Sequence, residues 1–334
     1  MKNYFKFNLT GNKLLPVWIV FMVFFLIPYV YVQFKLQGLK DQSTDPHEVM
    51  NRLGEMLQWY GFMFLLIVVE YIILFFIAKL AIEAIEFKEK SLSFAGKING
   101  YLSVLVPGFL LSLITLGIYS PWFMVKMINF FAKNSSYESD SFEFKGKGGD
   151  LFVLILITLI IPMMFVMSGI MIFAFTMGMK GTMPTEALGQ FSGVAIIMML
   201  AVILIVIPFM YNYYKWIVNF SFKNYSIKWE TNFWSSVATI LGQVLLSIIT
   251  IGIYVPLAYL RLLNYFAGKT IARSEISSKK FGYDIEPGDD FLFIWGQLLL
   301  TIITLGIYYP WAFCKVLNRV LGKSYSEEIE IEKV

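Results

Sequence analysis

The sequence predicts an all-α polytopic membrane protein. About ten helices are expected, arranged as five pseudo-repeated helical hairpins, with short β-strand segments that form a small cytoplasmic sheet. Three observations indicate this class. The chain has an excess of apolar residues in long runs, it contains one ten-residue phrase three times, and short segments of alternating polarity precede the apolar runs.

The apolar composition excludes an ordinary soluble domain. Of the 334 residues, 58% are hydrophobic and 15% are charged, whereas soluble domains have about 45–50% apolar and about 25% charged residues. The apolar runs are too many for a globular core, and about 20 apolar residues are enough to cross a bilayer. They lie at about residues 14–34, 58–82, 99–118, 121–132, 150–178, 191–220, 234–253, 256–267, 290–308 and 310–321.

The repeated phrase has the composition of a tight turn between two helices. Its glycine can adopt a positive φ and end the first helix, which we expect of Gly117, Gly252 and Gly306. The proline that follows suits the first turn of the next helix, and the tyrosine between them suits the boundary of a bilayer. The three copies are LITLGIYSPW at Leu113–Trp122, IITIGIYVPL at Ile248–Leu257 and IITLGIYYPW at Ile302–Trp311.

Short segments that alternate apolar and polar residues precede the hairpins, which indicates β-strands. They lie at Phe5–Gly11, Ser91–Lys97, Ser141–Lys147, Tyr225–Thr231 and Phe281–Gly288, and Glu327–Val334 alternates in the same way. The sequence therefore predicts one membrane domain, 1–334, in which strand, helix and helix repeat five times before a last strand. The repeat units cover residues 4–89, 90–134, 135–222, 223–270 and 271–323, and the last strand covers 325–334.

The basic residues predict the orientation in the membrane. Lysine and arginine are concentrated in the strand-bearing loops, so the positive-inside rule places both termini and all strands in the cytoplasm. The segments that follow the three phrases, 121–132, 256–267 and 310–321, are shorter than the roughly 20 residues that a spanning helix needs. They can cross with polar ends, form re-entrant hairpins or lie along the interface. We favour hairpins, because an interfacial placement would scatter the lysines over both faces.

Polar side chains flank the turns at fixed offsets. Thr250 and Thr304 precede two of the glycines, and Gln243 and Gln297 lie seven residues before these threonines. Such offsets fall on one helical face, where a hydroxyl or amide can form an interhelical hydrogen bond worth about 0.6–2 kcal/mol. The alternative is that these residues line a polar path between repeats.

Each turn is followed by a basic residue and, three residues later, by an asparagine. The pairs are Lys126 and Asn129, Arg261 and Asn264, and Lys315 and Asn318. A charge inside a bilayer costs about 2.5–3.5 kcal/mol on insertion scales, so such a residue often has a function. The long side chains can reach the headgroups from a short helix. Alternatively, three cations and three amides converge near a pseudo-symmetry axis and bind an anion such as a lipid phosphate.

Glu70 is a carboxylate in the middle of an apolar run. At that depth it either has a partner on another helix or carries a proton, and we expect a structural ion pair or a role in coupling protons or cations. Asp150, Asp289 and Asp290 precede helices and are expected to be N-caps. With one histidine and one cysteine, Cys314, we expect no disulfide, no metal site and no cofactor, and no catalytic residues are visible, so the protein is not expected to be an enzyme.

The turn phrases, each followed by a basic residue, resemble those of the YjgN family of bacterial inner-membrane proteins, also called domain of unknown function 898. The segments Phe142–Gly146 and Lys279–Phe291 resemble a Phe-x-Phe/Tyr-x-Gly phrase of that family. The resemblance covers most of Leu92–Gly322. The first unit departs from it, and Leu257 stands where the second and fifth units have tryptophan. The resemblance implies a multi-pass protein of the bacterial inner membrane and brings no established activity.

We expect a transport or channel-like protein that passes or binds a small solute or a lipid. Its polar path would be lined by Glu70, Gln243, Gln297, Thr250, Thr304 and the three pairs of basic residue and asparagine. The alternative is a non-catalytic membrane scaffold that docks a partner through its cytoplasmic β segments. Membrane lipids are the expected partners and nucleic acid is not; a protein partner or a second copy of the chain is a further possibility. A water-filled path that reaches Glu70 would favour transport over the scaffold.

Overall fold

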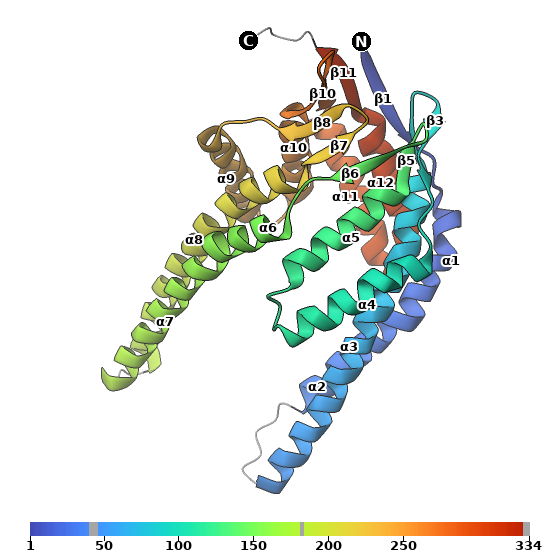
Figure 1. The fold of residues 1–334 in the computed structure, drawn as a ribbon. Helices are drawn as coiled ribbons and strands as arrows, with labels where there is room; N and C mark the ends of the chain where they lie inside the picture. Colours follow the sequence, from blue (N-terminus) through green and yellow to red (C-terminus); the bar gives the residue numbers. More distant parts are fainter. Residues whose placement is uncertain (40–45, 181–183, 330–334) are drawn as a thin grey trace. The chain divides into compact units, whose positions relative to one another are not determined.

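The computed structural model describes residues 1–39, 46–180 and 184–329 (Figure 1). The chain forms two compact units. The larger unit consists of Met1–Tyr4, Ala95–Phe293 and Lys323–Val334, and the smaller unit consists of Phe5–Phe94 and Ile294–Gly322. Each unit therefore combines segments from distant parts of the sequence, and strand β1 (Lys2–Phe7) and helix α11 (Pro287–Ile303) contribute residues to both.

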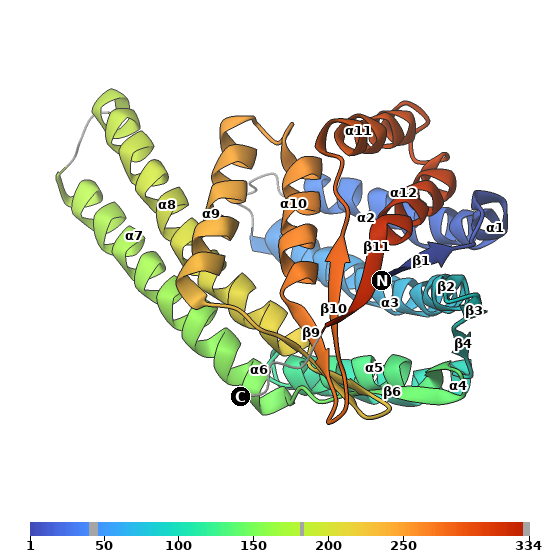
Figure 2. The ribbon, with the colours of Figure 1, turned by 90° about the horizontal axis from the view of Figure 1, so that it is seen from above.

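The larger unit contains helical hairpins and most of the strands. Its helices are α4 (Ile98–Ile114), α5 (Ser120–Asn134), α6 (Gly148–Ile155), α7 (Ile161–Lys180), α8 (Pro184–Ile217), α9 (Phe233–Ile249), α10 (Val255–Gly268) and the start of α11. A π-helical segment, η2 (Leu156–Ile160), joins α6 to α7. Its strands are β5 (Ser135–Tyr137), β6 (Asp140–Phe144), β7 (Phe220–Phe222), β8 (Tyr225–Trp229), β9 (Thr270–Arg273), β10 (Ser278–Tyr283), β11 (Ser324–Ile329) and the start of β1. Figure 2 shows α7 beside α8 and α9 beside α10.

The smaller unit is built around one long helix. Its helices are α1 (Gly11–Phe21), the π-helical η1 (Met22–Leu26), α2 (Ile27–Gly38), α3 (Pro46–Glu83), the rest of α11 and α12 (Tyr309–Lys323) up to Gly322. Its strands are the end of β1, β2 (Ile85–Phe87), β3 (Lys90–Ser91) and β4 (Ser93–Phe94). Helices α1 and α2 continue into each other through η1 and pack along α3.

The prediction of an all-α fold with a small sheet is wrong, because eleven strands in the described residues take part in extended antiparallel pairing. In the larger unit, residues Lys2–Tyr4 of β1 pair with β11, and the order continues through β10, β9, β8, β7, β6 and β5. In the smaller unit, Phe5–Phe7 of β1 pair with β2, and β2 pairs with β3. All of these pairs are antiparallel.

The short strands that follow the hairpins are not predicted from the sequence. Strands β2, β5, β7 and β9 have only three or four residues, which is too few to show an alternating pattern. Two of them turn into the next strand through residues with positive φ, at Lys88–Glu89 (47° and 63°) and Glu138–Ser139 (53° and 72°). Positive φ at both central residues is the backbone of a type I′ hairpin, for which asparagine and glycine are the usual signals. Lysine, glutamate and serine occupy these positions here, so the sequence gives no signal for the turns.

The strands that were predicted end in a buried aromatic residue that joins the sheet to the helices. These residues are Phe7, Phe94, Phe144, Trp229 and Tyr283. In the smaller unit Phe7 packs with Leu14 and Cys314. In the larger unit Trp229 packs with Tyr211 and Ile240 of the helices above it. The alternation seen in the sequence thus marks strands with one face against the helices.

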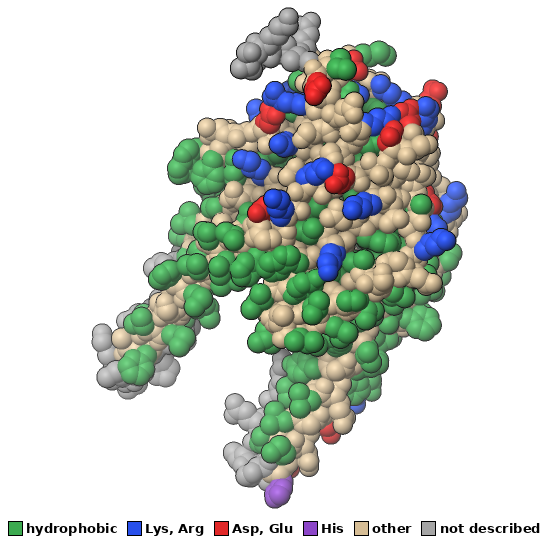
Figure 3. Space-filling view, in the orientation of Figure 1, with side chains coloured by type: hydrophobic (Ala, Val, Ile, Leu, Met, Phe, Trp, Pro, Cys, Tyr) green, Lys and Arg blue, Asp and Glu red, His purple; other side chains and the backbone are tan. Residues whose placement is uncertain are grey.

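Two kinds of hairpin are present. Among the described residues, four segments are long and apolar enough to cross a membrane by length and composition: Gly11–Gly38, His47–Glu83, Gly148–Phe173 and Leu200–Ile217. The three hairpins with the repeated phrase are shorter, since α4, α9 and α11 have 17 residues each. Such a helix is about 25 Å long, and the hydrocarbon of a bilayer is about 30 Å thick. Charged side chains gather over the strands, whereas hydrophobic side chains cover the long helices (Figure 3).

Candidate functional site

The three repeated phrases fold into the same turn. In each one the glycine N–H donates to the carbonyl five residues earlier at 2.7 to 2.8 Å, and the residue before the glycine donates to the carbonyl three residues earlier at 2.9 to 3.0 Å. This is a Schellman arrangement, which satisfies the free carbonyls at a helix end. Gly117, Gly252 and Gly306 have φ of 89°, 83° and 87°. The prediction that these glycines have a positive φ is confirmed, although the left-handed backbone begins one residue before each of them.

The residue before each glycine is strained and exposed. Leu116, Ile251 and Leu305 have φ of 50°, 50° and 49°, a left-handed conformation that costs an L-residue about 1–2 kcal/mol and that usually belongs to glycine. Their side chains are 93%, 92% and 84% exposed. The hairpin tips therefore present apolar side chains that are almost fully exposed within the described part of the chain.

The threonines that precede the glycines hydrogen bond within the turn. The hydroxyl of Thr250 donates to the carbonyl four residues earlier at 2.8 Å and accepts from the N–H of Tyr254 at 3.1 Å. Thr304 makes the same pair of bonds at 2.7 Å and, from Tyr308, at 3.0 Å. These hydroxyls fix the tyrosine at the start of the next helix.

Tyr308 is the centre of a polar cluster in the smaller unit. Its hydroxyl donates to Gln297 Oε1 at 2.9 Å and accepts from Lys315 Nζ at 2.8 Å. Gln297 lies on α11 and Lys315 on α12, so the cluster connects the two helices of one hairpin. The structure thus brings together two residues of the predicted path through a tyrosine that sequence analysis assigned only to the bilayer boundary.

Tyr254 and Tyr119 occupy the matching positions in the larger unit. The Tyr254 hydroxyl donates to Gln243 Oε1 at 2.9 Å, and the Arg261 guanidinium carbon lies 5.6 Å from the centre of the Tyr254 ring. Lys126 Nζ lies 5.5 Å from the centre of the Tyr119 ring. Both distances suit a cation–π contact. The signal in the sequence is a basic residue seven positions, or two helical turns, after the turn tyrosine.

The three basic side chains are exposed and extend toward the turn. A long side chain on a helix points toward the N-terminus of that helix, and α5, α10 and α12 each begin at a turn. The cations are therefore held on the tip side of their backbone positions, away from the strands.

The remaining predicted residues have separate surroundings. Asn318 Nδ2 donates to the carbonyl of Phe7 at 2.7 Å and fastens α12 to β1 within the smaller unit. Asn129 and Asn264 are half-buried, one helical turn beyond their basic residues. Glu70 is half-buried on α3, and it forms no hydrogen bond or ion pair within the described part of the chain. A partner for Glu70 stays a prediction.

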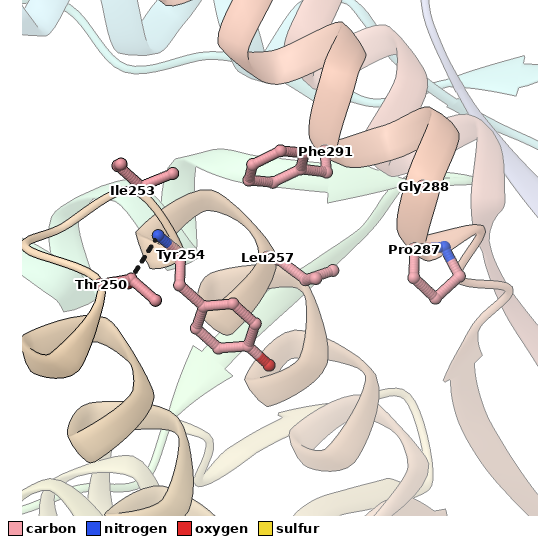
Figure 4. A pocket seen from close by; sticks show the side chains of 7 residues that line it. All are labelled: Thr250, Ile253, Tyr254, Leu257, Pro287, Gly288 and Phe291. Carbon is pink, nitrogen blue, oxygen red and sulfur yellow. Dashed lines mark hydrogen bonds between the residues drawn. The ribbon is translucent and has the colours of Figure 1, made fainter.

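Two pockets have apolar walls. The first has a volume of about 230 Å³ and lies in the larger unit, between the α9–α10 turn and the start of α11 (Figure 4). It is lined by Thr250, Ile253, Tyr254, Leu257, Pro287, Gly288 and Phe291. The second has a volume of about 560 Å³ and lies in the smaller unit, between α1 with η1 and α3. It is lined by Pro16, Val17, Val20, Phe24, Val69, Ile72, Ile73 and Phe76.

A buried ion pair holds the start of α11 in the larger unit. Asp290 is fully buried and accepts hydrogen bonds from Lys323 Nζ at 2.6 Å, the Glu286 N–H at 2.9 Å and the Tyr283 hydroxyl at 3.2 Å. The prediction that Asp290 and two other aspartates are N-caps is wrong, because α6 and α11 begin before these residues and include them in the first turn. Asp290 instead reaches back to the N–H that precedes its helix.

A second carboxylate of the larger unit is held by strand β1. Asp284 accepts hydrogen bonds from Lys2 Nζ at 2.6 Å and from the Tyr4 hydroxyl at 2.7 Å. These bonds, the one from Lys2 above all, lower the pKa of Asp284, and Asp284 raises the pKa of Lys2. In the described ranges, no three side chains of histidine, cysteine, aspartate or glutamate gather into a metal site.

Comparison with known proteins places the chain in a family. Residues 2–286 match the model of a family described as bacterial protein of unknown function (DUF898). The chain belongs to the DUF898 family. This confirms the resemblance seen in the turn phrases, and the long apolar helices make this DUF898 chain a membrane protein.

A curated relative matches part of the DUF898 chain. The inner membrane protein YjgN of Salmonella typhimurium strain LT2 is 41% identical over 71 residues, which is 21% of this chain. The match spans only 18% of that relative's length. No solved structure matches the chain.

Proposed function

We propose that this DUF898 protein binds phospholipid in the bacterial inner membrane and holds the lipid phosphate at the basic residues of its short hairpins. The long apolar helices cross the membrane several times, with both termini in the cytoplasm. The placement in the inner membrane is supported by the name of the curated relative. The observation that carries the proposal is found in three hairpins: a cation held against a tyrosine, close to an exposed apolar tip.

The seven-residue spacing between the tyrosine and the basic residue indicates how deep the hairpin lies in the membrane. Seven residues of helix span about 10 Å, so the apolar tip extends about 10 Å beyond the backbone of the basic residue. Half of the hydrocarbon layer is about 15 Å thick. A hairpin that holds the backbone of its basic residue at the headgroups therefore keeps its tip inside one leaflet. This agrees with re-entrant hairpins and with the short length of α4, α9 and α11.

The basic residues suit a phosphate. The Arg261 guanidinium is a planar fork that can donate two parallel hydrogen bonds to phosphate oxygens. The Lys315 ammonium has three N–H donors, of which one is used by the Tyr308 hydroxyl. Because the tyrosines already hold the cations in place, less side-chain freedom is lost when a phosphate binds.

The pockets favour a lipid over a small polar solute. The larger pocket is lined by Val69, Ile72 and Ile73, the neighbours of Glu70 on α3, and its other walls are apolar as well. A hydrated ion or polar solute would lose its water there without gaining hydrogen bonds. Lipid binding, and passage of the bound lipid, therefore fit these walls better than a solute channel does.

A scaffold that docks a protein through its strands has less support. Strand β3, which pairs with β2 in the smaller unit, consists only of Lys90 and Ser91, and both are exposed. Very short strands with a lysine are a common means of preventing sheet edges from pairing with another chain. The proposal involves no catalytic step.

The test is the number of lipids retained by purified variants. Native mass spectrometry with phosphatidylglycerol would compare the wild type with the triple variant K126A/R261A/K315A. The matched control is K13A/K133A/K215A, which removes three exposed lysines from helices α1, α5 and α8. A charge-assisted hydrogen bond contributes about 1.5–3 kcal/mol, so we expect binding at each site to weaken at least about tenfold in the first variant and to stay unchanged in the control.

Equal lipid retention by the wild type and the first variant would overturn the proposal, once circular dichroism shows that both are folded. Inorganic phosphate in millimolar excess is the second arm of the experiment. If it displaces the bound phosphatidylglycerol, the site binds free phosphate and the lipid assignment is wrong. If the lipid stays bound, the site recognises the whole amphiphile.

A further inference from the structure

A tryptophan lies against a glycine beside two of the three turns. Trp122 contacts Gly148, the first residue of α6, and Trp311 contacts Gly11, the first residue of α1. A β-carbon added to Gly148 would lie 2.7 Å from the Trp122 ring, and one added to Gly11 would lie 2.5 Å from the Trp311 ring. Each indole therefore packs where only a glycine leaves room for it.

The α9–α10 turn has no tryptophan at this position, and a pocket lies beside it. Leu257 stands at the tryptophan position of the α9–α10 turn, and Pro287, the first residue of α11, stands where α1 and α6 begin with glycine. Leu257, Pro287, Gly288 and Phe291 all line the pocket of about 230 Å³ (Figure 4). The pocket therefore exists where an indole fills the matching place beside the other two turns.

We propose that this pocket binds an acyl chain of the phospholipid whose phosphate meets Arg261. The inference rests on the proposed function and names a second contact of the same lipid. Tyr254 connects the two parts, because its ring lines the pocket and the Arg261 guanidinium carbon lies 5.6 Å from the centre of that ring. An apolar pocket with a cation at its rim fits an amphiphile with a negative headgroup.

The walls of the pocket exclude a polar occupant. Its two hydroxyl groups are already used, since Thr250 donates to a carbonyl of its own helix and Tyr254 donates to Gln243. The other lining side chains are apolar. A buried water needs two to four polar partners, which this pocket does not offer, whereas a hydrocarbon chain needs none.

The experiment fills the pocket with the residue of the sister turns. The probe is phosphatidylglycerol with a diazirine near the end of one acyl chain, bound to the wild type, to L257W and to L257A. We expect photocrosslinks to residues 250–257 and 287–291 in the wild type, a loss of at least about tenfold in L257W because the indole occupies the space, and retention in L257A. The indole of L257W has the pocket of about 230 Å³ to occupy, and circular dichroism is measured to show that the variant is folded.

Absence of crosslinks at these residues in the wild type, or persistence of the crosslinks in a folded L257W, would overturn the pocket assignment. The two proposals fail in different ways. If only the pocket is wrong, removal of the Arg261 side chain still reduces lipid retention. If the proposed function is wrong, retention does not depend on Arg261, whatever the crosslinks show.

Discussion

The buried pair of Asp290 and Lys323 allows a quantitative prediction for Asp290→Ala. The carboxylate is fully buried and receives hydrogen bonds from Lys323, the Glu286 N–H and the Tyr283 hydroxyl, of which the one from Lys323 is 2.6 Å long. Removing one partner of a buried ion pair costs about 3–5 kcal/mol, because the remaining charge has no compensation. Lys323 keeps a hydrogen bond to Glu286 and its side chain is 19% exposed, so we expect the lower end, about 3 kcal/mol of unfolding free energy.

Two further variants test the cause of this loss. Asp289→Ala removes the adjacent carboxylate, which is exposed, and should change the unfolding free energy by less than about 0.5 kcal/mol. The double variant D290N/K323M removes both charges. We expect it to be at least about 1 kcal/mol more stable than the sum of its single variants predicts, because no charge is left buried and unpaired.

The assay is denaturant unfolding of the purified protein in detergent micelles, followed by circular dichroism. A loss below about 1 kcal/mol for Asp290→Ala would refute the reasoning, since even a single unsatisfied buried donor costs that much. Strict additivity in the double variant would also refute it, because the two charges would then not depend on each other.

Three further predictions concern the turns and the sheet. Because hydrogen bonds from β1 lower the pKa of Asp284, its contribution to stability should be complete above about pH 4 and lost as the pH falls through the lowered pKa; the difference in stability between wild type and D284N should shrink over that range in unfolding titrations. Gly252→Ala should destabilise the protein by about 1 kcal/mol, because φ is +83° there, whereas Gly242→Ala, inside α9 with open space around it, should stabilise it by about 0.5–1 kcal/mol. Tyr308→Phe removes two hydrogen bonds and Tyr254→Phe removes one, so Tyr308→Phe should lower the unfolding free energy by about 1 kcal/mol more.

The turns could be predicted from the sequence because their chemistry is local. A glycine that ends one helix and a proline that begins the next lie within five residues, and each has a conformational reason to be there. The left-handed residue was not predicted, because Leu116, Ile251 and Leu305 hold a conformation that glycine usually adopts. A helix end assigned from glycine alone is displaced by one residue in all three turns.

The sheet and the site could be predicted only in part because they depend on distant contacts. Strand β9 has four residues and is recognisable only beside β8 and β10. The sequence places Lys315 and Gln297 near each other. It does not show that the Tyr308 hydroxyl joins them, because a tyrosine at this position is already explained by the boundary of the bilayer. Leu257 was seen to replace a tryptophan, yet the resulting space becomes visible only once Gly288, which is 31 positions away in the sequence, lies opposite to it.

The left-handed residues at the tips of the short hairpins raise the free energy of the folded chain, and no packing within the described part of the chain offsets this strain. A leucine or isoleucine in the left-handed conformation is less stable by about 1–2 kcal/mol, and an exposed side chain gains nothing from packing. Transfer of that side chain from water into hydrocarbon gains about 1.5–3 kcal/mol. The strain is therefore outweighed when the tip lies in lipid and is not outweighed when it lies in water.

Ile251→Gly separates these two effects. It relieves the strain and removes the apolar contact, so the tip of the α9–α10 hairpin should lie closer to the headgroups. A fluorophore on I253C, in a background where the buried Cys314 is replaced by alanine, would report depth through quenching by lipids that carry a nitroxide near the end of the acyl chain. We expect strong quenching with Ile251 present, weaker quenching in I251G, and no reaction of unlabelled I253C with membrane-impermeant thiol reagents from either side. A tip that reacts from the periplasmic side would show that the hairpin crosses the membrane, and equal quenching in both proteins would show that Ile251 does not set the depth.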